Sequence, residues 1–285
     1  MNALVCGLNS YLGRASLLYL QDELFQVHGI VRDSTLIHSK IQEPIRAALY
    51  DVDIIRYNPE NINVYIPDCQ LAFYFTQTPE LIDDISSHYE ILSLRNYILF
   101  SQKNNCNRII YIGTIYNRKH LTAIEKLFNE LQVQYTIVIK DVAIGNHTSF
   151  EDFMQKMLKN KLIYLYKPAK NILLRPTTLK DLMEWLRTTD WKTNYIDSYV
   201  EFGGQKAIEL EQIMKYYEEK LSPHTKHFTL PINNKKLSIS LNKYISNVPY
   251  AQYAEFIAEL SSRKEIDSLI DYKVSYPPIE KLIES

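Results

Sequence analysis

Val5-Cys6-Gly7-Leu8-Asn9-Ser10-Tyr11-Leu12-Gly13-Arg14 is the stretch of this sequence that decides the fold. It continues a short apolar run and places two glycines six residues apart, Gly7 after the run and Gly13 within a segment of helical period. The first glycine permits a tight turn from strand to helix, and the second lets the helix pack closely on the sheet. The first turn of such a helix also offers free N–H groups to a diphosphate. Residues 4–20 therefore predict a strand, a turn and a helix that bind a dinucleotide.

The middle position of the turn is Ser10, where such turns usually carry a glycine. Either the diphosphate lies slightly farther from the backbone, or the Ser10 hydroxyl joins the N–H groups as a donor. Two glycines at this spacing are also compatible with a close crossing of a strand and a helix that binds nothing. The ordered series of strands that follows favours the dinucleotide turn.

The first half of the chain alternates short apolar runs with segments of helical period, which is typical of βαβ units on a parallel sheet. We expect strands at residues 3–6, 27–31, 52–56, 71–75, 108–112 and 135–139. We expect helices at residues 10–20, 37–49, 79–103 and 121–131. The third of these helices has the clearest start, with Thr78 as its N-cap and Pro79 in its first turn. Right-handed crossovers then give an α/β fold, a doubly wound parallel sheet of the Rossmann type.

After Gly145 the pattern changes to scattered helical segments, short strands and proline-bearing loops. We expect helices at residues 150–158, 179–186, 210–221 and 250–261, and a mobile polar loop at residues 222–244. The chain is thus expected to have a dinucleotide-binding Rossmann domain at residues 1–147. A smaller, mostly helical cap at residues 148–285 follows it, with some of its elements returning to the Rossmann core.

Composition limits the class of protein. The hydrophobic share of 46% is enough for a sizeable core. Lys and Arg number 32 against 33 acidic residues, a balance that gives no electrostatic reason to expect nucleic acid or a membrane surface as a partner. The three cysteines, Cys6, Cys69 and Cys106, are widely separated and are expected to be reduced core residues. The N-terminus leads straight into a strand, so we expect a cytoplasmic protein.

The residue that follows the second expected strand decides which dinucleotide is bound. An acidic side chain there accepts from the ribose 2′-hydroxyl of NAD(H), whereas a cation pairs with the 2′-phosphate of NADP(H). Here that residue is Arg32, and Asp33 comes next. Arg32 favours NADP(H), Asp33 keeps NAD(H) as an alternative, and the two together are also compatible with a solvated loop pair.

The sequence resembles the short-chain dehydrogenase/reductase superfamily, in its atypical branch of NmrA-like and nucleoside-diphosphate-sugar-epimerase-like proteins. The resemblance covers nearly the whole chain, although each motif is a loose one. It rests on the Gly7 to Gly13 turn and on the segments Val31-Arg32-Asp33, Phe73-Tyr74-Phe75, Arg108-Ile109-Ile110-Tyr111-Ile112-Gly113, Val142-Ala143-Ile144-Gly145, Leu174-Arg175-Pro176-Thr177-Thr178-Leu179-Lys180-Asp181-Leu182 and Phe202-Gly203-Gly204-Gln205.

That resemblance implies hydride transfer assisted by a Tyr-x-x-x-Lys pair and a Ser or Thr at the end of the preceding strand, the lysine lowering the pKa of the phenol. This sequence departs from the pattern, because His120 stands four residues after Tyr116. Thr114 fills the hydroxyl position, and Tyr116 with His120 or Lys126 is a candidate proton relay. The alternative is that Thr114 caps the turn, Tyr116 packs and His120 starts a helix. The candidate catalytic residues are Thr114, Tyr116 and Lys126.

The remaining candidate residues concern binding. Arg175, where the chain enters the cap, is a candidate for an anionic group of the substrate, with a structural salt bridge as its alternative. No metal site is expected, since His224 and His227, three residues apart in a polar segment, have no cysteine near them. The expected cofactor-binding residues are Gly7, Asn9, Ser10, Tyr11, Leu12, Gly13, Arg32, Asn58, Thr76 and Gly113.

Three functions are therefore compatible with the sequence. The first is an NADP(H)-dependent oxidoreductase that acts on a small carbonyl or enone. The second is a non-catalytic regulator that senses NADP(H) and presents a surface to a protein partner, and the third is an enzyme similar to sugar-nucleotide epimerases. A homodimer is compatible with each of them.

Overall fold

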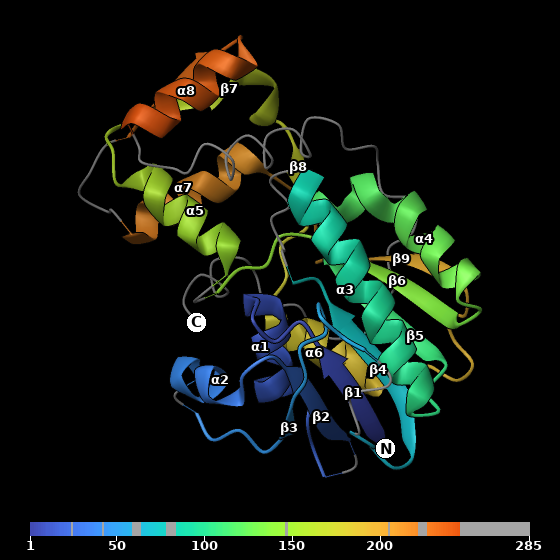
Figure 1. Cartoon of the computed structure of the whole chain (residues 1–285). Helices are drawn as coiled ribbons and strands as arrows, with labels where there is room; N and C mark the ends of the chain where they lie inside the picture. The colour runs from blue at the N-terminus through green and yellow to red at the C-terminus, as the bar shows by residue number, and fades with distance from the viewer. Residues whose placement is uncertain are drawn as a thin grey trace. The chain divides into compact units, whose positions relative to one another are not determined.

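The computed structural model describes residues 1–23, 25–41, 43–58, 64–77, 84–145, 148–204, 206–221 and 227–245, and of residues 84–87, 116 and 119 it describes the backbone alone. The chain divides into two compact units (Figure 1). The first unit comprises Met1–Lys140 and Lys180–Glu201. The second unit comprises Asp141–Leu179 and the described residues from Phe202 onward. Each unit is described by itself below.

A seven-stranded sheet forms the first unit, and its strand order is β3-β2-β1-β4-β5-β6-β9. Neighbouring strands pair in parallel, and Val5 of β1, for example, lies beside Gly29 on one side and Phe73 on the other. The strand order reverses between β1 and β4, which is the switch point of a doubly wound sheet. The expected α/β fold is confirmed. The strands are β1 (Asn2–Cys6), β2 (Gln26–Val31), β3 (Ala48–Asp51), β4 (Cys69–Phe75), β5 (Arg108–Thr114), β6 (Gln134–Lys140) and β9 (Ser198–Phe202).

Helices cover both faces of this sheet (Figure 1). Because side chains alternate along a strand, Phe73 and Tyr74 point to opposite faces. The Tyr74 ring lies 5.5 Å from that of Tyr97 in α3, whereas Phe73 lies 6.2 Å from Trp191, which follows α6. Both β4 side chains are fully buried, as expected for a sheet covered on both sides. The helices are α1 (Tyr11–Tyr19), α2 (Ser34–Lys40), α3 (Asp84–Lys103), α4 (Leu121–Glu130) and α6 (Leu179–Thr188), with a 3-10 helix η1 (Ile115–His120) between β5 and α4.

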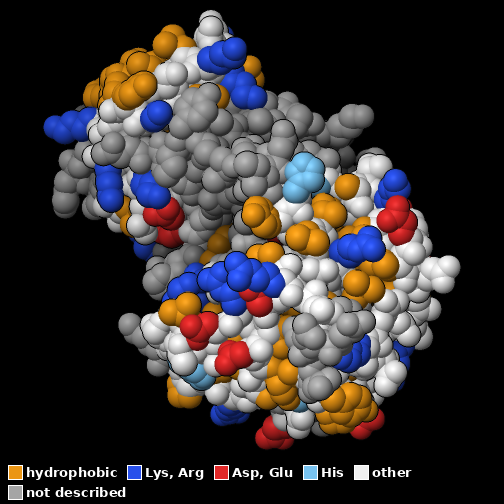
Figure 2. Space-filling view, viewed as in Figure 1, with side chains coloured by type: hydrophobic (Ala, Val, Ile, Leu, Met, Phe, Trp, Pro, Cys, Tyr) orange, Lys and Arg blue, Asp and Glu red, His pale blue; other side chains and the backbone are white. Residues whose placement is uncertain are grey.

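The second unit is built from shorter elements. Strands β7 and β11 pair in parallel, and β8 and β10 pair antiparallel. The buried Tyr217 hydroxyl donates to the Glu151 carboxylate, which joins α7 to α5. Exposed apolar side chains occur on both β11 and α8, among them Phe228 and Tyr244. Figure 2 shows hydrophobic side chains gathered in the region of α8. The elements are α5 (Ser149–Leu158), β7 (Leu162–Tyr166), η2 (Lys167–Ala169), β8 (Leu173–Leu174), β10 (Ile208–Glu209), α7 (Leu210–Leu221), β11 (Phe228–Ile232) and α8 (Lys235–Ile245).

The second crossover differs from the sequence prediction. The helix expected at residues 37–49 ends at Lys40, and the strand expected at residues 52–56 lies at Ala48–Asp51 instead. Pro44 explains the short helix, because proline lacks the N–H that a helix needs and keeps the residue before it extended. Residues 52–56 turn rather than extend, since the Asp53 carboxylate accepts from the backbone N–H groups of Ile55 and Arg56.

The polar segment at residues 222–244 is also different from the expectation. Instead of one loop, its described part contains β11 and α8. The polar side chains of α8 are used internally: the Ser238 hydroxyl and the Asn242 amide both donate to the Tyr164 carbonyl, at 2.7 and 2.6 Å. The helix expected at residues 250–261 and the Thr78-Pro79 start of the third helix lie outside the described residues.

The division into units places the first boundary at Lys140, where the sequence suggested residue 147. Helix α6, apart from its first residue, and strand β9 up to Glu201 belong to the first unit. Cys6, Cys69 and Cys106 are buried and free, as expected. Across the residues that the structure describes, no helix is both long and apolar enough to span a membrane.

Candidate functional site

At two positions, Gly7 and Gly13, the turn between β1 and α1 has no room for a residue larger than glycine. Gly7 has a φ of +87°, and a Cβ built on it would lie 1.9 Å from the Phe75 carbonyl oxygen. A Cβ on Gly13 would lie 2.1 Å from the Gly7 carbonyl oxygen. Since each of these contacts is with backbone, the turn cannot relax around a larger residue. The spacing read from the sequence thus reflects a close approach of α1 to the ends of β1 and β4.

Ser10 caps helix α1. Its hydroxyl accepts from the Gly13 N–H at 3.1 Å and donates to the Gly7 carbonyl at 2.9 Å. The residue has extended backbone angles, φ −82° and ψ 158°, so the position does not require glycine. The hydroxyl therefore acts as both donor and acceptor within the turn. The N–H groups of Tyr11 and Leu12 lie in the first helical turn, where no partner exists within the helix.

Arginine side chains lie at this turn and beside it: Arg14 contacts the turn, and Arg32 lines the adjoining pocket. The Arg14 guanidinium donates to the Asn9 carbonyl at 2.6 Å, and burial lowers the pKa of Arg14 from its ordinary value. Figure 2 shows Lys and Arg side chains gathered in the region of α1. Together with the positive end of the α1 dipole, they make the turn attractive to an anion.

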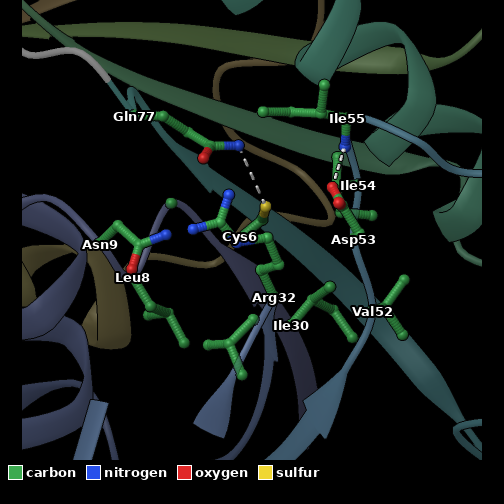
Figure 3. A pocket seen from close by; sticks show the side chains of 12 residues that line it. Cys6, Leu8, Asn9, Ile30, Arg32, Val52, Asp53, Ile54, Ile55 and Gln77 are labelled. Carbon is green, nitrogen blue, oxygen red and sulfur yellow. Dashed lines mark hydrogen bonds between the residues drawn. The ribbon is translucent and has the colours of Figure 1, made fainter. Parts of the chain in front are cut away.

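A pocket lies beside the turn, within the first unit, and its empty space of about 470 Å³ includes open solvent (Figure 3). Asn9 and Arg32 face each other across it, and apolar side chains form its lower wall in Figure 3. The lining residues come from the ends of β1, β2 and β4 and from the turn after β3, and they are Cys6, Gly7, Leu8, Asn9, Ile30, Val31, Arg32, Val52, Asp53, Ile54, Ile55 and Gln77.

Arg32 and Asp33 have different roles at the end of β2. Arg32 is exposed and reaches into the pocket (Figure 3). Asp33 instead caps α2, where its carboxylate accepts from the Thr35 hydroxyl and N–H and from the Leu36 N–H. The Thr35 hydroxyl, followed by these N–H groups, lowers the pKa of Asp33 below its ordinary value. Asp51 is engaged similarly, accepting from the Ser34 N–H at 2.7 Å. The cation therefore faces the pocket, and the nearby carboxylates serve the helix start.

The sequence did not identify Asp53 or Gln77 as pocket residues. Asp53 lies in the turn that replaced the expected third strand, so the misplaced strand concealed it. The Gln77 N–H donates to the Glu90 carboxylate at 3.1 Å, and the Gln77 side chain donates to the Ser93 hydroxyl and lies 3.9 Å from the Cys6 sulfur. Burial, with a smaller contribution from the Glu90 charge, raises the pKa of the Cys6 thiol to about 12. Asn58, also expected at the site, is exposed and does not line the pocket.

Thr76, Gly113 and Thr114 meet at the carboxyl ends of β4 and β5, around Asn117. The Thr114 N–H and hydroxyl both donate to the Asn117 side-chain oxygen, at 2.7 and 3.2 Å, and the Asn117 amide donates to the Thr76 hydroxyl at 3.4 Å. A Cβ on Gly113 would lie 3.0 Å from the same Asn117 oxygen. Nothing in the sequence singled out Asn117, which holds the start of η1 against the sheet.

The three candidate catalytic residues are not brought together by what the structure describes. Thr114 is 1% exposed and hydrogen-bonded to Asn117. The side chain of Lys126 is 76% exposed on the outer face of α4, where it pairs with Glu130 at 3.7 Å. The Tyr116 side chain lies outside the described atoms, and His120 immediately precedes α4.

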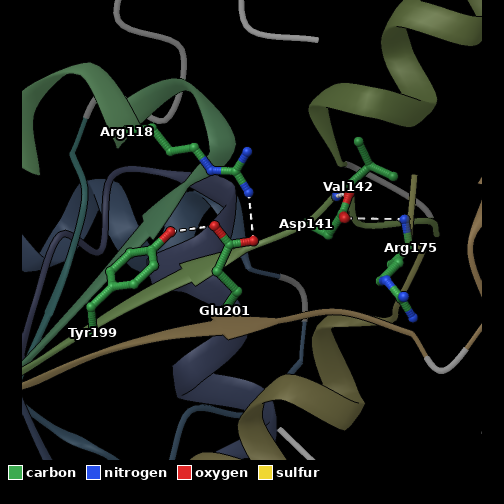
Figure 4. Close-up of polar contacts among 6 residues, drawn as sticks. All are labelled: Arg118, Asp141, Val142, Arg175, Tyr199 and Glu201. Atoms are coloured by element: carbon green, nitrogen blue, oxygen red, sulfur yellow. Dashed lines mark hydrogen bonds and ion pairs between the residues drawn. The ribbon is translucent and has the colours of Figure 1, made fainter. Parts of the chain in front are cut away.

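Figure 4 shows two further clusters of polar contacts, one in each unit. In the first unit, Arg118 of η1 pairs with Glu201 at 2.5 Å, and the Tyr199 hydroxyl donates to the same carboxylate. In the second unit, the Arg175 N–H donates to the Asp141 carboxylate at 3.0 Å, and its guanidinium approaches the Gly204 carbonyl at 3.5 Å. Arg175 thus contacts protein groups through both its backbone and its side chain. Within the described residues, no group of three or more metal-ligating side chains occurs.

Comparisons with known proteins agree with this architecture. No family model matches the sequence, and no curated protein matches it. Solved structures do match: triphenylmethane reductase from Citrobacter sp., complexed with NADP(H), has a TM-score of 0.70 at 13% identity, covering 100% of this chain and 99% of that one. This chain shares the overall fold of that protein. The Rossmann fold expected from the sequence is thereby confirmed.

Two other structures extend the comparison. Leucoanthocyanidin reductase from Vitis vinifera has a TM-score of 0.65 at 12% identity, covering 100% of this chain and 98% of that one. A nucleoside-diphosphate-sugar epimerase from Staphylococcus aureus has a TM-score of 0.64 at 12% identity, covering 100% of this chain and 96% of that one. At these identities the similarity shows a shared Rossmann fold.

Proposed function

We propose that this chain binds NADP(H) in the first unit and acts as an oxidoreductase on a small carbonyl or enone. The proposal rests mainly on the two side chains at the end of β2: Arg32 faces the pocket, and Asp33 caps α2. A ribose 2′-phosphate would meet a cation there. A 2′-hydroxyl would need the Asp33 carboxylate, whose Oδ1 atom already accepts three hydrogen bonds at the start of α2.

The residues around the pocket suit each part of the dinucleotide. Arg32 would bind the 2′-phosphate, and the apolar wall that includes Ile30 and Ile54 would receive the adenine. Asp53 lines the same pocket; its Oδ1 atom accepts from the Ile55 and Arg56 N–H groups, and its Oδ2 atom would accept from the adenine amino group. The diphosphate would lie at the first turn of α1, and the nicotinamide would extend toward the carboxyl ends of β4 and β5. Reduced NADP supplies a hydride when bound.

The first unit offers limited help with proton transfer. Tyr116 remains the proposed proton donor and Thr114 the proposed hydroxyl group, since Thr114 ends β5 and Tyr116 stands two residues later. Lys126 has no part in the proposal, because it is exposed and pairs with Glu130 on the outer face of α4. The reduction of a strongly polarised carbonyl or enone suits such a site, since hydride transfer then needs little acid assistance.

The burial of Thr114 favours a second function. If Thr114 serves only to fix η1 through Asn117, the site binds NADP(H) without turnover, and the protein is a sensor of that cofactor. Sensor and enzyme share the binding site. They differ in whether bound NADPH is consumed when a panel of aldehydes, ketones and enones is supplied.

Binding of the cofactor is tested by titrating the protein with NADPH and NADH and comparing Arg32→Ala with Arg56→Ala. Arg56 is an exposed arginine nearby that does not line the pocket, so it controls for loss of surface charge. We expect the wild type to prefer NADPH, and Arg32→Ala to lose about 10- to 100-fold in NADPH affinity, as for loss of a hydrogen bond to a charged group. An unchanged preference in Arg32→Ala would show that another residue selects the cofactor.

A further inference from the structure

Lys140 is the last residue of β6, and it is 2% exposed. Lysine is rarely buried to this degree, because removing an ammonium from water is costly unless other groups stabilise it. Its partner in the register of the sheet is Thr114, the last residue of β5. A buried cation therefore lies at the carboxyl edge of the sheet, where ligands bind in open α/β folds.

The direction of the Lys140 side chain is given by its contact with Tyr11. The Lys140 Nζ atom lies 5.6 Å from the centre of the Tyr11 ring, within the range of a cation–π interaction. Tyr11 is the first residue of α1 and directly follows the Ser10 cap. Strands β4 and β5 separate β6 from β1 in the sheet. The ammonium consequently points along the carboxyl edge toward the start of α1.

The start of α1 is suited to an anion. Its first turn has no acidic residue, and the Ser10 hydroxyl is engaged with Gly7 and Gly13. The helix dipole and the Lys140 ammonium thus place two sources of positive potential at one end of the helix. Arg32 is a third cation, but it belongs to the pocket at the end of β2, on the other side of the Gly7 turn.

We propose that the Lys140 ammonium binds the diphosphate of the dinucleotide, at the phosphate nearer the nicotinamide, and that the Tyr11 ring positions the ammonium for this contact. The inference rests on the proposed function and extends it to a residue at the far end of the site. Arg32 then recognises the adenosine end and Lys140 the nicotinamide end. The hydrogen bond from the ammonium to a phosphate is charge-assisted and stronger than a neutral one.

Two ligands distinguish the role of Lys140 from that of Arg32. NADPH contains the phosphate nearer the nicotinamide, whereas adenosine 2′,5′-bisphosphate lacks it but keeps the 2′-phosphate. We expect Lys140→Met to raise the dissociation constant for NADPH about 10- to 100-fold, as for loss of a hydrogen bond to a charged group, and to leave that for adenosine 2′,5′-bisphosphate within about twofold. Lys103→Met, at an exposed lysine at the end of α3, is the matched control and should change neither constant.

The possible outcomes are distinct. Equal NADPH affinities of wild type and Lys140→Met would overturn the proposal, and so would an equal loss for both ligands, which would indicate a distorted turn. If the wild type binds neither ligand, the proposed function itself fails. If Lys140→Met does not fold, Tyr11→Leu replaces it: we expect a weaker affinity for NADPH alone, and no change for either ligand would overturn the proposal.

Discussion

Replacement of Ser10 by alanine separates two roles that the sequence left open for this residue. In the structure the hydroxyl caps α1, and both of its hydrogen-bonding functions are engaged with Gly13 and Gly7. If that is its role, Ser10→Ala destabilises the protein and leaves dinucleotide affinity nearly unchanged. If the hydroxyl instead donates to a phosphate, the variant loses affinity.

The size of the stability loss follows from which groups lose a partner. The Gly7 carbonyl also accepts from the Ser10 backbone N–H at 3.1 Å, so it keeps one hydrogen bond in the variant. The Gly13 N–H loses its acceptor, which corresponds to the loss of an N-cap, about 1 kcal/mol. For a domain of about 150–250 residues, a change of this size lowers Tm by about 2–4 °C. Ser10→Gly should cost only a few tenths of a kcal/mol, because glycine is itself a tolerable N-cap.

Thermal unfolding of wild type, Ser10→Ala and Ser10→Gly measures the first effect, and NADPH titration of the same proteins measures the second. We expect Tm to fall in the order wild type, Ser10→Gly, Ser10→Ala, with dissociation constants that agree within about twofold, well under the tenfold that 1.4 kcal/mol would produce. A variant with unchanged Tm and a tenfold weaker affinity would refute the assignment of the hydroxyl as a cap.

Other positions give further predictions. Gly13→Ala should destabilise the chain by about 3 kcal/mol in urea unfolding and abolish NADPH binding, because its Cβ would lie 2.1 Å from a backbone oxygen; a stable variant that binds would contradict the turn. Asp33→Asn should keep both the α2 cap and the NADPH preference. Since the folded pKa of Asp33 is lowered, its contribution to stability is complete above the ordinary Asp pKa and is lost as pH falls through the folded value, a dependence that the variant should lack in acid unfolding. With a pKa of about 12, Cys6 should resist alkylation at pH 8 in the native protein and react only after unfolding, as mass spectrometry of the modified peptide would show.

The sequence predicted the sheet because its strands are almost continuously apolar, and five of the six expected strands lie at or within a few residues of the observed ones. The third was wrong because residues 52–56 have a strand-like composition, whereas Pro44 and Asp53 decide the local structure. Composition alone does not show that a proline ends a helix four residues earlier, or that a carboxylate turns the chain back on itself.

The candidate site was predictable only in part. Gly7, Gly13 and Arg32 were found because their roles depend on local spacing along one βα unit. Asn117 could not be found in this way, since its importance comes from contacts with Thr76 and Thr114 on two different strands. Sequence distance also concealed which lysine lies near the turn.

Lys126 was selected by its place after Tyr116, but an exposed face of α4 carries it outward. In the sequence, Lys140 is simply the polar residue that follows an apolar strand. Its burial becomes visible only when β6 is placed three strands from β1, with its side chain over Tyr11. The pairing of strands that are distant in the sequence therefore determines which lysine lies near the start of α1. A motif search along the chain does not detect this pairing.

Direct titration of the wild-type protein with NADPH and NADH, followed by calorimetry or by cofactor fluorescence, tests the central claim most directly. The Gly7 turn, the α1 N-terminus and the Arg32 pocket predict saturable binding of one NADPH per chain, with NADH bound more weakly. Absence of saturable binding by either dinucleotide would contradict the claim that this site holds one.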